Sequence, residues 1–202
     1  RRRCRARAGE RDVVVPGTTV TVPLRTPRLM LRAYRADDAA FVRDLYARAE
    51  VQRYIGDGTQ RVSSDGQARE KIRGWDQGYA HEPVLGVWAI VDPVGALAGT
   101  LLLKPIPDSG TNTATDVEVG WHLHPRAWGR GYATEAARAV LAHAFEHGQD
   151  RVVAVTHPAN RASQAVCHRL GMTHRGLSRA YYDAECALFE LRAPTAHEGE
   201  AA

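Results

Sequence analysis

A glycine-bearing loop that leads directly into a long amphipathic helix is the most constraining feature of the sequence. The loop lies in "HPRAWGRGYATEA" (124–136), where a single arginine separates Gly129 from Gly131. The apolar residues of 132–147 recur at i, i+3, i+4 and i+7, which predicts a helix with one buried face. The preceding "VEVGWHL" (117–123) is rich in β-branched and aromatic residues and is typical of a strand. This strand–loop–helix unit needs a sheet to pack against.

The loop suits an anionic ligand. The first-turn amides of a helix have no intrahelical acceptor, and the helix dipole adds roughly half a positive charge there. Glycines let a phosphate approach the backbone closely, and Arg126 and Arg130 add charge at the rim. The loop matches neither the P-loop pattern nor G-x-G-x-x-G, since Thr134 stands where the third glycine would be. A plain β–α turn that needs glycines for its geometry is the alternative.

The remaining patterns predict a mixed α+β domain. A turn at 93–95 joins two of the expected strands as a hairpin. The order β-α-α-β-β-β-α-β-α-β-β combines hairpins with one β-α-β crossover, so helices should cover both faces of a mixed sheet. The strands are predicted at 28–34, 84–92, 96–106, 117–123, 151–157, 172–182 and 185–192, and the helices at 37–50, 63–80, 132–147 and 161–171.

The net charge of +4 comes from the start of the chain, because residues 1–11 hold six arginines and one glutamate. We expect residues 1–22 to be a disordered extension, 23–193 a single domain and 194–202 a tail. An arginine block can bind nucleic acid, but the near-neutral remainder argues against such a partner.

Composition also bears on location and on metals. No apolar run is long enough to cross a bilayer, and none follows the arginines as in a secretory signal. Cys4, Cys167 and Cys186 form no CxxC pair, which favours a reducing compartment such as the cytoplasm. The histidines show no metal-ligand spacing, so no metal is expected.

Several ordered motifs resemble those of the GNAT superfamily of N-acetyltransferases. Arg126-Ala-Trp-Gly129-Arg130-Gly131 matches the family's acetyl-CoA signature, an Arg or Gln followed by Gly-x-Gly or Gly-x-Ala after two residues. A second motif is matched by Asn160-Arg-Ala-Ser163 and then by "LGM" (170–172). The opening "TPRLMLRAYRADDAAFV" is similar to the RimJ and RimL branch of ribosomal-protein N-terminal acetyltransferases. The resemblance spans about 24–192.

The resemblance implies a GNAT-type, mostly antiparallel sheet of about six to seven strands with about four helices, splayed between 117–123 and 151–157. It implies acetyl-CoA as cofactor, with its pyrophosphate on backbone amides. The implied cofactor-binding residues are Leu123, Arg126, Trp128, Gly129, Arg130, Gly131, Tyr132, Ala133, Asn160 and Ser163.

The implied function is direct acetyl transfer, in a ternary complex, to the primary amine of a protein N-terminus or a small molecule. A homodimer is compatible with it. A non-catalytic acyl-CoA-binding module is the alternative.

Acetyl transfer to an amine needs a base, an oxyanion donor and an acid for the thiolate. Alternation places Glu118 and His122 on one strand face as candidates for the base. Their structural alternatives are an ion pair for Glu118 and aromatic packing for His122. The resemblance implies an oxyanion donor near Leu123 and makes Ser163 a partner of the thiol, with capping as its alternative. Cys167 stands where many relatives carry an acid tyrosine, so the acid is undetermined.

The acceptor pocket is less well determined. The resemblance implies that helices in 37–80 and the last hairpin wall it. Acidic residues near the last turn, Asp183 and Glu185, could attract a cationic amine. Aromatic residues that are expected either there or in the core are Tyr54, Trp75, Trp88, Tyr181 and Tyr182.

Overall fold

The computed structural model describes residues 21–56, 61–111 and 113–194. The arginine-rich stretch and most of the predicted tail lie outside the described residues. Thr21 and Val22, at the end of the predicted extension, are described, and the Val22 carbonyl accepts a hydrogen bond from the Trp88 indole at 2.9 Å. None of the helices in the described ranges is long and apolar enough to cross a membrane.

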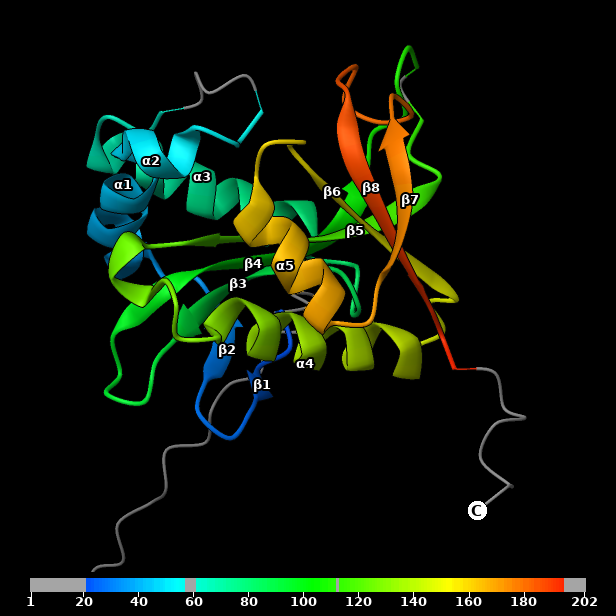
Figure 1. Cartoon of the computed structure of the whole chain (residues 1–202). Coiled ribbons are helices and arrows are strands. Elements are labelled where there is room, and N and C mark those ends of the chain that lie inside the picture. The colour runs from blue at the N-terminus through cyan, green and yellow to red at the C-terminus, as the bar shows by residue number, and fades with distance from the viewer. Residues whose placement is uncertain (1–20, 57–60, 112, 195–202) are drawn as a thin grey trace, which may run out of the picture.

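An eight-stranded sheet forms the centre of the molecule, in the order β1-β2-β3-β4-β5-β6-β8-β7 (Figure 1). Every neighbouring pair is antiparallel except β5 with β6. The mixed, mostly antiparallel sheet is therefore confirmed, with one strand more than expected because the short β1 pairs with β2. The strands are β1 (Leu24–Arg25), β2 (Met30–Ala33), β3 (Gly86–Val91), β4 (Leu97–Ile106), β5 (Asp116–Leu123), β6 (Arg151–Thr156), β7 (Thr173–Ser178) and β8 (Cys186–Arg192).

The helices lie on both faces of the sheet, as predicted (Figure 1). They are α1 (Ala39–Ala47), α2 (Ala49–Gln52), α3 (Asp65–Gly78), α4 (Tyr132–Glu146) and α5 (Arg161–Arg169), with short 3-10 turns η1 (Ala36–Asp38) and η2 (Pro125–Ala127). The single helix predicted at 37–50 is wrong, because Arg48 has extended backbone angles and divides it. The Gln52 side-chain amide bonds the Tyr46 carbonyl at 2.9 Å, which satisfies an acceptor at the end of α1.

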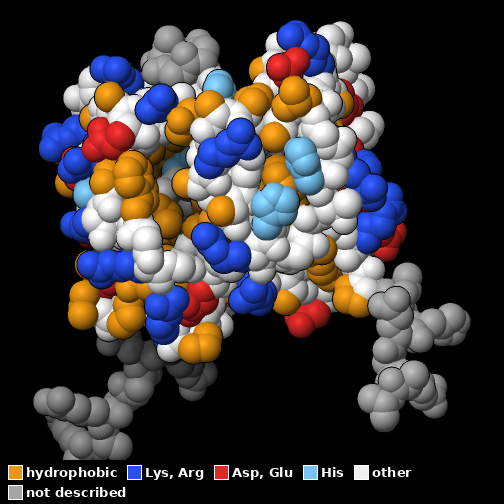
Figure 2. Space-filling model, viewed as in Figure 1, with side chains coloured by type: hydrophobic (Ala, Val, Ile, Leu, Met, Phe, Trp, Pro, Cys, Tyr) orange, Lys and Arg blue, Asp and Glu red, His pale blue; other side chains and the backbone are white. Residues whose placement is uncertain are grey.

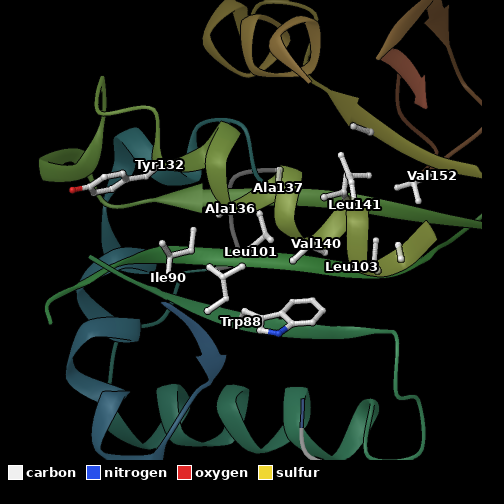
Figure 3. Close-up of a cluster of buried hydrophobic side chains, with 14 of the residues drawn as sticks. Trp88, Ile90, Leu101, Leu103, Tyr132, Ala136, Ala137, Val140, Leu141 and Val152 are labelled. Carbon is white, nitrogen blue, oxygen red and sulfur yellow. The ribbon is translucent and has the colours of Figure 1, made fainter. Parts of the chain in front are cut away.

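The alanine-rich face of α4 packs on the sheet. Alternate residues of β3, Trp88 and Ile90, point toward α4 together with Leu101 and Leu103 of β4 (Figure 3). The intervening β3 residues face α1 and α3 on the other side. Small alanines let α4 approach the strands closely, and burying each large apolar side chain contributes about 1.5–3 kcal/mol. This packing fixes the start of α4 at the end of β5.

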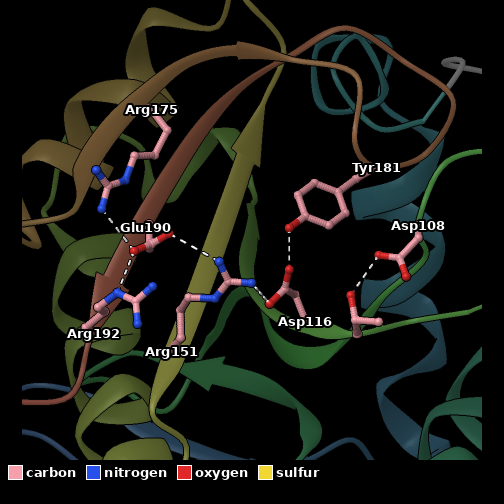
Figure 4. A network of polar contacts seen from close by, with 8 residues as sticks. Asp108, Asp116, Arg151, Arg175, Tyr181, Glu190 and Arg192 are labelled. Carbon is pink, nitrogen blue, oxygen red and sulfur yellow. Dashed lines mark hydrogen bonds and ion pairs between the residues drawn. The ribbon is translucent and has the colours of Figure 1, made fainter.

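The parallel strands β5 and β6 separate from each other along most of their length. Within the described residues its register is confined to Glu118 opposite Val153, so the carboxyl ends of both strands diverge. A polar network closes the other end: Arg151 of β6 bonds Asp116 of β5 and, at 3.3 Å, Glu190 of β8 (Figure 4). The expected splay between 117–123 and 151–157 is confirmed.

Candidate active site

Polar contacts of His124 and Arg126 fix the loop between β5 and α4. The ring of His124 accepts the Arg126 amide on Nδ1 at 3.2 Å and contacts Asp44 of α1 through Nε2 at 3.0 Å. The Arg126 guanidinium donates to the Leu97 carbonyl at 2.7 Å. These contacts tie the loop to α1 and to the start of β4, so its backbone is positioned before any ligand binds.

The glycines of the loop have left-handed backbone angles, with φ of 73° at Gly129 and 78° at Gly131. Such angles favour glycine over residues with a Cβ. The first amide of α4 that bonds back into the preceding turn is that of Glu135, to the Gly131 carbonyl at 3.1 Å. The amides of 132–134 therefore have no acceptor within the helix.

A groove with a volume of about 2310 Å³ runs from this loop to the face of β5 that carries Glu118 and His122. Figure 2 shows the surface hollowed between the α1–α2 side and α5, with lysine and arginine side chains along the rim. The groove is lined by most of the predicted cofactor-binding residues, namely Leu123, Trp128, Gly129, Gly131, Tyr132, Ala133, Asn160 and Ser163.

The positive charge beside the loop comes from a different residue than the sequence predicts. Neither Arg126 nor Arg130 lines the groove. Instead, the Arg28 guanidinium lies 3.4 Å from the position of a Cβ on Gly131 and 5.2 Å from the Tyr132 ring centroid. Arg28 also forms an ion pair with Glu135 at 2.6 Å, which neutralises the carboxylate in the first turn of α4.

Two buried hydroxyl groups of the groove have no hydrogen-bond partner within the described residues. In the described part of the chain, the hydroxyls of Thr134 and Thr156 are buried and have no hydrogen-bond partner, and both residues line the groove. An unsatisfied buried hydroxyl is costly unless a ligand or water bonds it. On the opposite rim, Asn160 Oδ1 accepts the Ser163 amide at 3.2 Å, so Asn160 caps α5.

Glu118 is buried, with 6% of its surface exposed, and has two polar partners. Lys104 Nζ lies 2.8 Å from its carboxylate, and the Tyr182 hydroxyl donates to the same oxygen. The ion pair that the sequence left open is therefore present. Tyr182 and Asp183 have positive φ angles of 59° and 52°, a costly conformation for residues with side chains. The β7–β8 turn is thus strained where it brings Tyr182 to Glu118.

A chain of hydrogen bonds determines the tautomer of His122. Tyr34 donates to the Gly99 carbonyl at 3.0 Å, so Thr100 must donate to Tyr34 (2.7 Å) and accept from Tyr46 (3.1 Å). The Tyr46 oxygen, 3.0 Å from His122 Nδ1, then accepts the ring N–H. Within the described ranges nothing bonds Nε2, so its lone pair can accept a hydrogen bond.

The His122 ring is neutral at physiological pH. Burial, together with the positive charges of Lys71 and Lys104, lowers the pKa of His122 to about 4. A neutral ring with a free Nε2 lone pair can accept a hydrogen bond but is a weak base.

Three of the remaining candidates from the sequence lie outside the groove, and the others line it. Cys167 is fully buried in the core, and burial raises the pKa of its thiol to about 12, so it is a poor proton donor. Trp88 is a core residue, and Tyr181 is buried with its hydroxyl on Asp116 at 2.5 Å. Tyr54, Trp75 and Tyr182, together with Asp183 and Glu185, do line the groove.

Several groove residues were missed from the sequence: Arg28, Lys71, Lys104 and Thr156. Lys104 had a detectable signal, because it lies opposite Glu118 in the β4–β5 hairpin. The other residues reach the groove only through tertiary packing, which no local pattern reports.

The fold and groove define an enzyme class that holds a phosphate-bearing cofactor across a split parallel strand pair. A model of the acetyltransferase (GNAT) domain matches residues 28–173, and the chain belongs to this family. GNAT acetyltransferases use acetyl-CoA, so acetyl-CoA is the cofactor of this chain. The glycine loop, the free amides and the orphan hydroxyls fit such a ligand.

The relatives support this assignment. The chain is 31% identical to FsC-acetyl coenzyme A-N(2)-transacetylase of Aspergillus fumigatus over 75% of this chain and 65% of that relative, just under two thirds of its length. It is 30% identical to YkkB of Bacillus subtilis, over 74% of this chain and 84% of YkkB. The fold matches RimJ of Mycobacterium smegmatis, solved in complex with CoA-disulfide, with a TM-score of 0.69, 20% identity and coverage of 86% and 87%.

Proposed function

We propose that this protein transfers the acetyl group of acetyl-CoA directly to a primary amine within a ternary complex. The observation that supports this most strongly is the continuity of one groove from the glycine loop to Glu118 and His122. The groove can hold the cofactor and acceptor side by side, which lowers the barrier by positioning.

The first turn of α4 is the proposed cofactor anchor. The amides of 132–134 and the positive end of the helix dipole would bind the diphosphate, with Arg28 beside them. The Thr134 and Thr156 hydroxyls supply further donors. When bound, acetyl-CoA supplies an activated acetyl thioester.

The catalytic roles follow from the contacts. Glu118, paired with Lys104, accepts the proton of the acceptor amine directly or through a water. The free Nε2 lone pair of neutral His122 accepts a second amine hydrogen and orients the nucleophile. A backbone amide near Leu123 is the proposed oxyanion donor, and the Ser163 hydroxyl is the proposed partner of the leaving thiolate.

An amine screen with acetyl-CoA, with release of free thiol as the readout, tests the function. Acetylation of at least one amine class is the expected result, and acetylation must fall in Glu118→Gln. Tight CoA binding with no thiol release on any amine would favour the non-catalytic acyl-CoA-binding module. A cytoplasmic location, a homodimer and the lack of a nucleic-acid partner stay predictions, the first supported by the free thiols Cys167 and Cys186.

A further inference from the structure

Lys71 of α3 places a positive charge on the acceptor side of the groove. Its ammonium lies 5.0 Å from the ring centroid of Tyr46, which bonds His122, and 5.4 Å from that of Trp75. No carboxylate of the described residues lies within ion-pair distance of it. Aromatic faces attract a cation without neutralising it. Desolvation lowers the pKa of Lys71, as expected for a partly buried ammonium without a counter-charge.

The carboxylates that line the same groove differ from Lys71 in having partners. Their contacts are Glu118 with Lys104 at 2.8 Å, Glu135 with Arg28 at 2.6 Å, Glu50 with Arg48 at 3.6 Å, Glu185 with Arg179 at 3.6 Å, and Asp183 with the Gly110 amide at 2.7 Å. Arg53, another groove residue, likewise lies over an aromatic ring, that of Tyr54, and has no carboxylate partner in the described ranges. Lys71 and Arg53 are therefore groove cations that no carboxylate of the described residues pairs with.

We propose that the acceptor is a small amine that also carries a carboxylate, and that Lys71 binds this carboxylate while Glu118 and His122 receive the amine. The Lys71 ammonium carries one positive charge, which the single negative charge of a carboxylate balances. The inference rests on the proposed function and decides between its two acceptor classes. The α-carbon beside a protein N-terminal amine carries an amide in place of a free carboxylate.

Pairs of L-amino acids and their amides test the inference, because each pair differs in the carboxylate. Rates must be expressed per neutral amine, since the amide lowers the amine pKa. A carboxylate bound to a partly buried ammonium should raise kcat/KM of the acid over its amide by roughly 10- to 100-fold. Lys71→Met should remove this preference by slowing the acids far more than the amides.

Two further variants separate recognition from other roles of Lys71. Lys71→Arg keeps the charge but cannot act as a base, so it should retain most of the preference for acids. Arg73→Met removes a positive charge from the exposed face of the same helix, outside the groove. It should leave kcat/KM unchanged for both the acids and the amides. Calorimetric titration with CoA should give the same affinity in all three variants, because the contacts of Lys71 in the described part of the chain are with Tyr46 and Trp75 and not with the glycine loop.

The possible results distinguish this inference from the function on which it rests. Equal acetylation of acids and amides by the wild-type protein would overturn the inference alone. So would faster acetylation of peptides than of free amino acids, or an unchanged preference in Lys71→Met. If no amine is acetylated at all, the proposed function fails and the inference fails with it.

Discussion

Gly131→Glu is the sharpest test of the cofactor anchor, because its effects on stability and on binding can be calculated separately. Gly131 has φ of 78°, and a side chain there costs about 1–2 kcal/mol in backbone strain. Space adds little: the Cβ would meet only the Arg28 guanidinium, at 3.4 Å, and that side chain is 49% exposed. The variant should therefore fold with a free energy of unfolding lowered by about 1–2 kcal/mol.

The effect on binding should be larger. A carboxylate about 5 Å from a diphosphate charge, at an effective dielectric constant of about 20, costs about 3 kcal/mol. This corresponds to a loss of CoA affinity of roughly 100-fold. Gly131→Ala should share the loss of stability and keep most of the affinity, because it adds no charge.

Gly148 offers a matched control at the other end of α4. Its φ is 88°, nothing lies within 4 Å of its Cβ position, and it does not line the groove. Gly148→Glu should lower stability by a similar amount and leave CoA affinity unchanged. Denaturant unfolding and calorimetric CoA titration measure the two quantities. A folded Gly131→Glu protein that binds CoA within threefold of wild type would refute the assigned anchor.

Three further predictions concern the catalytic face and the core. Glu118→Gln should lower kcat/KM by roughly 100-fold, most strongly at low pH, where the amine is hardest to deprotonate. Glu190→Gln changes a buried carboxylate outside the groove and should leave kcat/KM unchanged. An equal loss from Glu118→Gln at every pH would indicate a structural role for Glu118. Because the folded pKa of His122 (about 4) is below the ordinary histidine value of 6.5, wild-type stability should fall as pH drops from 6.5 to 4, and it should fall less in His122→Gln. An equal fall in the free energy of unfolding of both proteins over this pH range would contradict the assignment. Cys167→Ala should lower the free energy of unfolding by about 1 kcal/mol and keep kcat within twofold of wild type. A large loss of kcat would indicate that Cys167 is the acid after all.

The parts of the site that depend on local pattern could be predicted from the sequence. Alternation in β5 places Glu118 and His122 on one face, and the structure shows both lining the groove. Gly129 and Gly131, which the sequence places in the loop before a helix, have the positive φ angles that favour glycine. Such features depend on neighbours within a few residues, and periodicity reports them directly.

The electrostatics of the site could not be predicted in the same way. Arg126 and Arg130 are adjacent to the loop in sequence, yet Arg28, about a hundred residues away, lies beside Gly131. Contacts of this kind require the docked elements, because they join residues that no short-range pattern relates.

The two halves of the groove come from different stretches of the chain. β5, α4, β6 and α5 are consecutive and form the half that carries the proposed cofactor anchor. The opposite wall is assembled from α1–α3, which precede this stretch, and from the β7–β8 turn, which follows it. Substitutions in those outer segments can therefore exchange one acceptor for another while the cofactor half is inherited intact.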